Sequence, residues 1–264
     1  MKPINPSSRR ALERVLISLM CFAGGCLSVP KPEPASAPHL ADNSIYLLHV
    51  SGVSGVTVFD AWFAEALKEA GAADDSGVFE WVGDRGILSA IRDIDGNRRI
   101  AGDIAKFVTA LRRANPHARI ALSSESAGAA MVIWALERLP SDVQVDSVMI
   151  AQPDVSPGYD LSAAMAHVNH HLFYTTSIFD FGTLGVWTRV LGTVDRVKGP
   201  GAGFVGFRAP AGADAAAYQR IVRVPWNPLA ILFLHPGSHS TAISPPYARC
   251  VLGPMLAADL SGEK

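Results

Sequence analysis

The stretch IALSSESAGAAMVIWALERL, residues 120–139, decides the fold class of this 264-residue chain. It begins as an apolar run, passes through small residues around Ser126, and continues at once in a helical pattern. A serine on such a sharp strand-to-helix turn presents its hydroxyl clear of the backbone, as a nucleophile must be. Strand and helix pass close together there, so the residues two before and two after the serine must be small; they are Ser124 and Gly128. A serine-rich surface turn is the alternative interpretation.

The composition favours one large globular domain. The chain is 49% hydrophobic and has a formal net charge of −1, whereas nucleic-acid binding requires a basic face. We therefore expect no nucleic-acid partner. A dinucleotide-binding domain is also disfavoured, because no G-x-G-x-x-G follows the first predicted strand.

Residues 1–25 have the pattern of an export signal. Basic residues lead into the apolar run 15–22, and small residues precede Cys26. Cys26 after Ala-Gly-Gly resembles the lipobox of bacterial lipoproteins, in which the cysteine becomes the lipidated first residue. The resemblance implies export to the bacterial cell envelope and a membrane anchor at Cys26. An ordinary signal peptide with a chance cysteine is the alternative.

The rest of the chain divides into three parts. Residues 26–43 are rich in proline and alanine and are predicted to form a tether, 44–258 the folded domain, and 259–264 a short tail. Cys250 is the one cysteine that remains after Cys26, so we expect no intrachain disulfide. We expect Cys250 to be a small, buried apolar residue.

The folded part alternates between predicted strands and helices. Strands are expected at 45–50, 78–82, 118–123, 145–151, 171–176 and 219–224, and helices at 59–70, 100–114, 128–139 and 246–258. This alternation predicts a mostly parallel, doubly wound α/β sheet with helices on both faces. In such sheets the ligand site lies beyond the carboxyl ends of the strands.

Four motifs spread over residues 44–256 resemble those of the α/β-hydrolase superfamily. They are LLHVSG at 47–52, SSESAG at 123–128, FYTTSIFD at 173–180 and GSHS at 237–240. The resemblance is to serine hydrolases of the esterase or lipase type, and to bacterial lipoprotein-type members. It implies an α/β-hydrolase fold that cleaves an ester, thioester or amide through an acyl-enzyme without a cofactor. The substrate would be a small-molecule or lipid ester, although this fold serves many reactions.

A nucleophilic serine needs a histidine to take its proton and a carboxylate to orient that histidine. In the family the order along the chain is serine, acid, histidine. Asp180 follows the strand 171–176 through a short turn, where the family places its acid. Asp154, after the preceding strand, and Asp195 and Asp160, in loops, stay open as alternatives.

Two late histidines are candidates for the base. His239 lies in a small polar loop before the closing helix, and we prefer it. His235 ends the apolar run 229–234 and is more readily explained as a packed residue. His170 and His171 precede the acid, and no cysteines or carboxylates stand near them at metal-ligand spacing. We therefore expect them to be structural and expect no metal.

The oxyanion hole should combine two backbone amides, that of Ala127 and that of Val53 or Gly52. Ser124 and Glu125 stand where Gly-His is commoner, and a carboxylate beside the nucleophile disfavours oxyanion charge. A non-catalytic envelope binding or scaffold protein of the same fold is therefore the alternative function.

The segment 184–207 has many glycines and no clear periodicity. We expect a loop over the carboxyl edge of the sheet near Asp180. Its length suggests a function, such as shaping the acyl or alcohol pocket.

Overall fold

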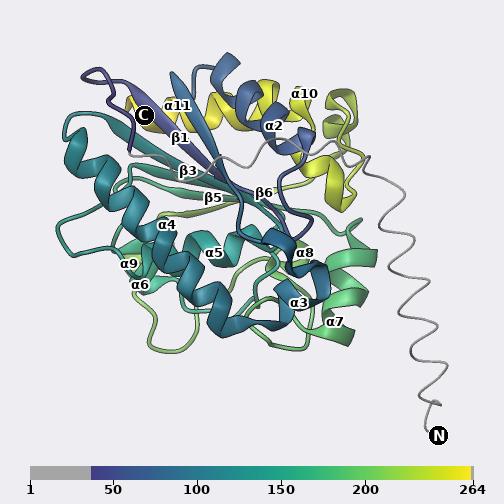
Figure 1. Ribbon diagram of the computed structural model, residues 1–264. Coiled ribbons are helices and arrows are strands. Elements are labelled where there is room, and N and C mark those ends of the chain that lie inside the picture. The colour runs from purple at the N-terminus through teal and green to yellow at the C-terminus, as the bar shows by residue number, and fades with distance from the viewer. Residues whose placement is uncertain (1–36, 263–264) are drawn as a thin grey trace, which may run out of the picture.

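The computed structural model describes residues 37–262. Six parallel strands form one sheet in the order β2-β1-β3-β4-β5-β6 (Figure 1). The strands are β1 (Ile45–Val50), β2 (Asp75–Phe79), β3 (Arg119–Glu125), β4 (Ser147–Ala151), β5 (Leu172–Thr176) and β6 (Ile221–Pro225). The predicted fold class, a parallel α/β sheet with helices on both faces, is confirmed.

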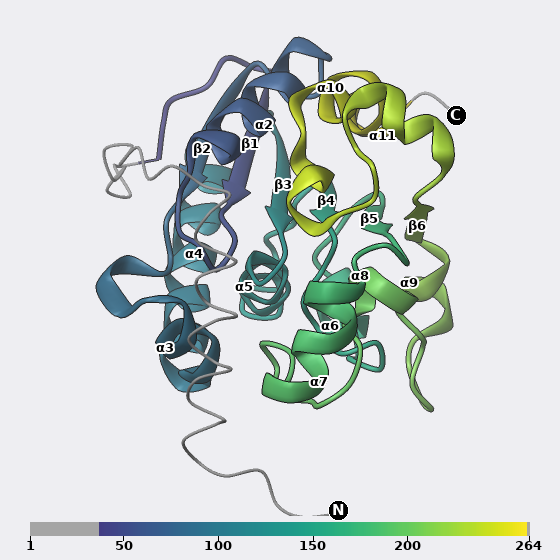
Figure 2. The same cartoon turned by 90° about the vertical axis from the view of Figure 1, so that its right-hand side faces the viewer.

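Helices cover both faces of this sheet (Figure 2). The longer ones are α2 (Val58–Glu69), α4 (Ile94–Ala114), α5 (Gly128–Leu136) and α11 (Gly253–Ser261). Short helical turns are η1 (Gly83–Arg85), α3 (Ile87–Arg92), α6 (Ser162–Met165), η2 (Phe181–Trp187), α7 (Thr188–Leu191), α8 (Ala202–Val205), α9 (Ala215–Gln219), η3 (Pro228–Phe233), η4 (His239–Ile243), α10 (Pro245–Tyr247) and η5 (Ala248–Leu252). The helices α4 and α5 pack on one face, and α2 and α11 pack on the other.

Strand β1 contributes side chains to the hydrophobic cores on both faces of the sheet. Its alternate residues Tyr46, Leu48 and Val50 point into the core under α4 and α5. Ile45 and Leu47 point into the core under α2 and α11. A strand buried on both faces must be apolar throughout, which explains the continuous run in the sequence.

The second strand lies three residues earlier than predicted. The expected strand 78–82 is corrected to Asp75–Phe79, because Glu80 and Trp81 make loop contacts instead of a ladder. The Trp81 indole nitrogen donates to the carbonyl of Ser51 at 2.7 Å. The Glu80 carboxylate accepts from the backbone amide of Val82 at 2.7 Å.

The predicted helices have other bounds in the structure: α2 begins and ends one residue earlier, and α5 ends at Leu136 rather than at 139. Helix α4 begins at Ile94 rather than at residue 100, because the Asp93 side chain caps it by accepting from the Gly96 amide at 2.9 Å. The closing helix predicted at 246–258 is divided into α10, η5 and α11.

The last helix also corrects the domain boundary. The residues 259–261, assigned to a tail from the sequence, belong to α11. Asp259 accepts a hydrogen bond from the Ser147 hydroxyl and pairs with His171 at 2.5 Å. These contacts hold α11 against the amino ends of β4 and β5.

Part of the predicted tether packs on the domain. The Pro38 carbonyl accepts from the Asn115 side chain at 2.9 Å, and the same side chain accepts from the Leu40 amide at 2.7 Å. The domain thus includes residues 37–43. The predicted signal peptide 1–25 and Cys26 lie outside the described residues. Within residues 37–262, no helix is both long enough and apolar enough to cross a membrane.

Two further expectations are corrected. Cys250 is exposed rather than buried, because it lies on the outer side of η5 while Ala248 and Leu252 face the core. The segment 184–207 is not a plain loop. It contains most of η2 together with α7 and α8, and the buried Leu184 anchors it beside Asp180 as expected.

Candidate active site

Ser126 sits on the predicted sharp turn. Strand β3 ends at Glu125, α5 begins at Gly128, and Ser126 between them has a φ of +50°. This left-handed conformation is uncommon for a residue with a side chain and typical of strained functional positions. A Cβ atom on Gly128 would lie 2.4 Å from the Ser51 carbonyl oxygen, so only glycine allows α5 to approach the β1 loop this closely.

The predicted acid and base meet at the same edge of the sheet. Asp180 follows β5, and His239 opens η4 after β6. The Nδ1 atom of His239 lies 2.5 Å from Oδ2 of Asp180. The side chain of Asp180 is 1% exposed and that of His239 is 18% exposed. The structure therefore brings these two residues together; that they act on Ser126 stays a prediction.

Gln152 is a site residue that the sequence analysis missed. It follows β4 directly and has a φ of +45°. Its amide nitrogen, in the orientation that satisfies both ends of the group, donates to the His239 carbonyl at 3.0 Å and to Asp180 Oδ2 at 3.1 Å. A polar residue directly after a buried strand was the one sequence signal for it.

The elbow is tied to β4 by backbone hydrogen bonds. The Ser126 amide donates to the Ala151 carbonyl at 2.9 Å, and the Asp154 amide donates to the Ser126 carbonyl at 3.0 Å. Within residues 37–262 the Ser126 hydroxyl makes no hydrogen bond. The charges of Glu125, directly before Ser126, and of Asp154 raise the pKa of His239.

Two alternative acids have structural partners. Asp195 accepts from the Ser156 amide at 2.9 Å, from the Ser156 hydroxyl at 2.5 Å and from the Thr193 hydroxyl at 2.6 Å. Asp160 accepts from the Ser162 amide at 2.9 Å and so caps a turn. Both carboxylates are therefore accounted for by local structure.

His235 and His171 also have structural partners. His235 is buried, its Nδ1 lies 2.9 Å from the Thr241 hydroxyl, and its ring packs on Tyr247. Burial lowers its pKa to about 4, which fits the packed role predicted for it. His171 pairs with Asp259 at the far edge of the sheet. The described residues hold no group of three or more metal-ligating side chains.

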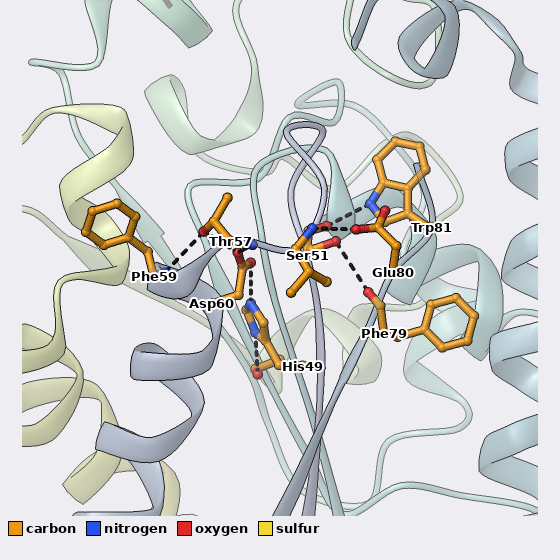
Figure 3. Close-up of polar contacts among 10 residues, drawn as sticks. His49, Ser51, Thr57, Phe59, Asp60, Phe79, Glu80 and Trp81 are labelled. Atoms are coloured by element: carbon orange, nitrogen blue, oxygen red, sulfur yellow. Dashed lines mark hydrogen bonds and ion pairs between the residues drawn. The ribbon is translucent and has the colours of Figure 1, made fainter. Parts of the chain in front are cut away.

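The loop after β1 contains Val53, whose amide was predicted to be an oxyanion donor. It is held by the Trp81 indole on the Ser51 carbonyl and by Glu80, whose carboxylate accepts from the Val56 amide at 2.5 Å (Figure 3). In the described part of the chain, the amides of Val53 and Ala127 donate to no other protein group. Their role as oxyanion donors stays a prediction.

A second histidine–carboxylate pair lies buried beneath this loop (Figure 3). His49 Nδ1 lies 2.9 Å from the Ser123 hydroxyl, and His49 Nε2 lies 3.1 Å from Asp60 Oδ1. All three residues are fully buried. Burial raises the pKa of Asp60, but hydrogen bonds from His49 and Thr57 and the charge of His49 outweigh it, so the pKa is lowered.

The site holds one histidine among three carboxyl groups. Burial and the charge of Asp60 raise the pKa of Glu125 to about 7, and burial raises that of Asp154 to about 7. Burial opposes the charged form of His239. The charges of Asp180, Glu125 and Asp154 outweigh it and raise the pKa of His239 above its ordinary value.

Apolar side chains are exposed next to Asp180 and His239. They form what we call the apolar rim: Ile178, Phe179, Phe181, Leu229, Ile231, Leu232 and Leu234. Phe179 of the rim packs on Trp226, which lies three residues before Leu229, with ring centroids 4.7 Å apart. Leu229 is 68% exposed and Leu232 is 75% exposed, and no Asp, Glu, Lys or Arg occurs from 226 to 248.

Comparison with known proteins gives distant structural likenesses only. The sequence matches no family model and no curated protein. A Trichoderma reesei cutinase, solved with a phosphonate inhibitor, is 12% identical over 84% of this chain and 78% of its own, with a TM-score of 0.43. A cutinase-like protein from Cryptococcus sp. is 13% identical over 86% of this chain and 97% of its own, with a TM-score of 0.43. At these values the likenesses carry no argument about activity.

Proposed function

We propose that the protein is a serine hydrolase that cleaves a carboxylic ester through an acyl-enzyme. The observation that carries the proposal is the 2.5 Å contact between Asp180 and His239, at the sheet edge where the Ser126 elbow also lies. An oriented histidine beside a strained serine turn is the arrangement that nucleophilic acyl transfer requires.

In the proposed reaction, the Ser126 oxygen bonds to the acyl carbon and its proton passes to His239 Nε2. Asp180 stabilises the resulting imidazolium, and the amides of Val53 and Ala127 donate to the oxyanion. The carbon–oxygen bond to the alcohol then breaks, and the alcohol leaves with the proton from His239. Water attacks the acyl-enzyme with His239 as base, releasing the acid and restoring the serine.

The apolar rim supports an apolar acyl or alcohol group in the substrate. Exposed apolar surface of this kind marks binding sites more often than plain surface, and it stands beside the proposed base. A lipid or other apolar ester therefore fits this site better than a charged, fully soluble one.

A fluorophosphonate probe tests the proposal. Such a probe phosphonylates an activated serine, so we expect wild-type protein to be labelled and Ser126→Ala to be unlabelled. The Ser124→Ala variant is a matched control, since its buried hydroxyl has no hydrogen-bond partner among the described residues, and it should still label. A folded wild type that never labels would instead favour the non-catalytic binding or scaffold function. The Glu125 carboxyl against Gly52 is the observation that favours this second function.

We further propose that the chain is exported and lipid-anchored through Cys26. The support is the signal-like pattern of residues 1–25 and the small residues before Cys26. Cells that express the full chain should incorporate labelled palmitate into it, and Cys26→Ser should abolish the label while Cys21→Ser should not.

A further inference from the structure

Glu125 reaches into the pocket where the oxyanion is expected. Side chains alternate along β3, so Glu125 points to the same face as Ser123, which contacts His49. Strand β1 lies beside β3, with Val50 opposite Ser124, and this register brings Glu125 beside the next loop. A Cβ atom on Gly52 would lie 2.3 Å from the Glu125 Oε1 atom. The carboxyl therefore rests directly on the Gly52 backbone.

The Gly52 amide and the Glu125 carboxylate interact favourably. This interaction lowers the pKa of Glu125 and works against the larger effect of burial. Gly52 was one of the two amides that the sequence offered as oxyanion donors. An ionised Glu125 thus occupies the amide of Gly52. Of the two amides predicted as donors in that loop, the amide of Val53 is then left.

Three further titratable groups face this carboxyl. They are Asp60 on α2, His49 on β1 and His239 at the start of η4. The charge of Asp60 disfavours ionisation of Glu125, and the charges of the two histidines favour it. Glu125 and His239 face each other, so the charge on one changes the titration of the other.

We propose that the ionised Glu125 carboxylate is an internal inhibitor of the oxyanion pocket, occupying the Gly52 amide and opposing the negative charge that develops during acyl transfer. Protonation of Glu125 removes that charge. This inference rests on the proposed hydrolase function and adds a positioning residue that acts through the oxyanion loop. The chemical reason is that a fixed negative charge beside a developing oxyanion destabilises the transition state.

The inhibition depends on pH in a defined direction. Glu125 titrates at a pKa of about 7, so the inhibiting form accumulates as the pH rises through that value. His239 sets the limit on the acid side. It acts as a base only when it is neutral, and because its pKa is raised, this requires a higher pH than for an ordinary histidine. The wild type should therefore work in a narrow pH range, with its activity falling on the alkaline side.

The test compares kcat/KM for a short p-nitrophenyl ester across pH 5–10 in full-length variants. Glu125→Gln is neutral at every pH, so we expect kcat/KM above pH 8 to rise about tenfold or more and the alkaline decline to vanish. Asp154→Asn removes the other raised carboxyl that faces His239 but does not touch Gly52. In Asp154→Asn, only the acid side of the pH profile of kcat/KM should move, and it should move to lower pH. Glu137→Gln, a partly buried acid bound to Tyr159, should change neither side.

A second measurement does not depend on turnover. In protein labelled with ¹⁵N-glycine, the Gly52 amide resonance should move with pH in the wild type, with a midpoint near 7, and stay fixed in Glu125→Gln. A Gly52 amide that does not titrate overturns the inference. So does a Glu125→Gln enzyme that loses activity, or an alkaline gain equally large in Asp154→Asn. By contrast, failure of Ser126 to react with fluorophosphonate in every variant at every pH overturns the hydrolase function itself.

Discussion

Two aspartate–histidine pairs stand near the carboxyl edge of one sheet, and they differ in their exposure to solvent. In the buried pair, Asp60 and His49, both side chains are 0% exposed, and both ring nitrogens of His49 have protein partners. In the edge pair, His239 is 18% exposed and uses Nδ1 for Asp180. Its Nε2 has no protein partner among residues 37–262.

The difference shows that the hydrogen bond between acid and histidine does not itself identify a catalytic pair. The buried pair has a serine hydroxyl in hydrogen-bond range of its histidine, and the edge pair does not. What separates the two pairs is access: His49 and Asp60 are 0% exposed, so no substrate can reach the Ser123 hydroxyl beside them. His239 of the edge pair is 18% exposed and is open to a substrate.

The largest effect is expected at the edge pair. Asp180→Asn and His239→Ala should each lower kcat/KM for p-nitrophenyl butyrate by about 10⁴-fold, as losses of triad members do. Asp180 is 1% exposed and accepts from the Leu184 amide, so activity is compared only in variants that circular dichroism shows to be folded. Full activity in either folded variant would show that the edge pair is not catalytic.

At the buried pair the same change should act on folding instead. Asp60→Asn leaves His49 without its charged partner in a fully buried position, which costs about 3–5 kcal/mol of unfolding free energy. Urea denaturation followed by circular dichroism measures the loss. The comparison breaks down if Asp60→Asn is as stable as the wild type or if its folded form is as inactive as Asp180→Asn.

The elbow that both pairs flank should be sensitive to a single methyl group. Gly128→Ala places a Cβ atom 2.4 Å from the Ser51 carbonyl oxygen and should cost about 1–3 kcal/mol of stability through overpacking. Gly158→Ala is the matched control, since its Cβ would meet nothing within 4 Å. Equal stability of the two variants would mean that α5 can move away from the β1 loop.

The smallest effect is expected at the apolar rim, which borders only the edge pair. Leu229→Ser and Leu232→Ser should slow hydrolysis of a long-chain ester presented in micelles by about threefold to tenfold, because each removes exposed apolar contact area. Turnover of a short soluble ester should not change. If it falls to the same extent, the rim supports the site's structure rather than substrate binding.

The sequence predicted the elements whose chemistry is local. The turn at Ser126 could be predicted because the need for Gly128 follows from strand and helix geometry alone. Asp180 could be selected because it closely follows a strand, where the resembled family places its acid, and parallel strands bring their carboxyl ends to one edge. His239 could be selected because it lies in a small polar loop after the last predicted strand.

Contacts between side chains from different elements could not be predicted in this way. The position of Glu125 against Gly52 depends on the register of β1 and β3, and Gln152 depends on a left-handed turn after β4. The run 229–234 forms the 3-10 turn η3 with most side chains exposed, whereas His235 directly after it is buried, as predicted. Apolar composition alone does not distinguish such a turn from a buried strand.

The place where residues 37–43 pack on the domain has a practical consequence. Pro38 and Leu40 are fastened to Asn115, at the end of α4 and the amino edge of the sheet, while Ser126 lies at the carboxyl edge (Figure 1). A support, tag or fusion partner joined ahead of residue 37 is therefore attached on the side away from Ser126. When the domain is immobilised in that way, the rim and His239 face the solution. The coated surface can then be assayed with substrates that are too large to diffuse into a gel.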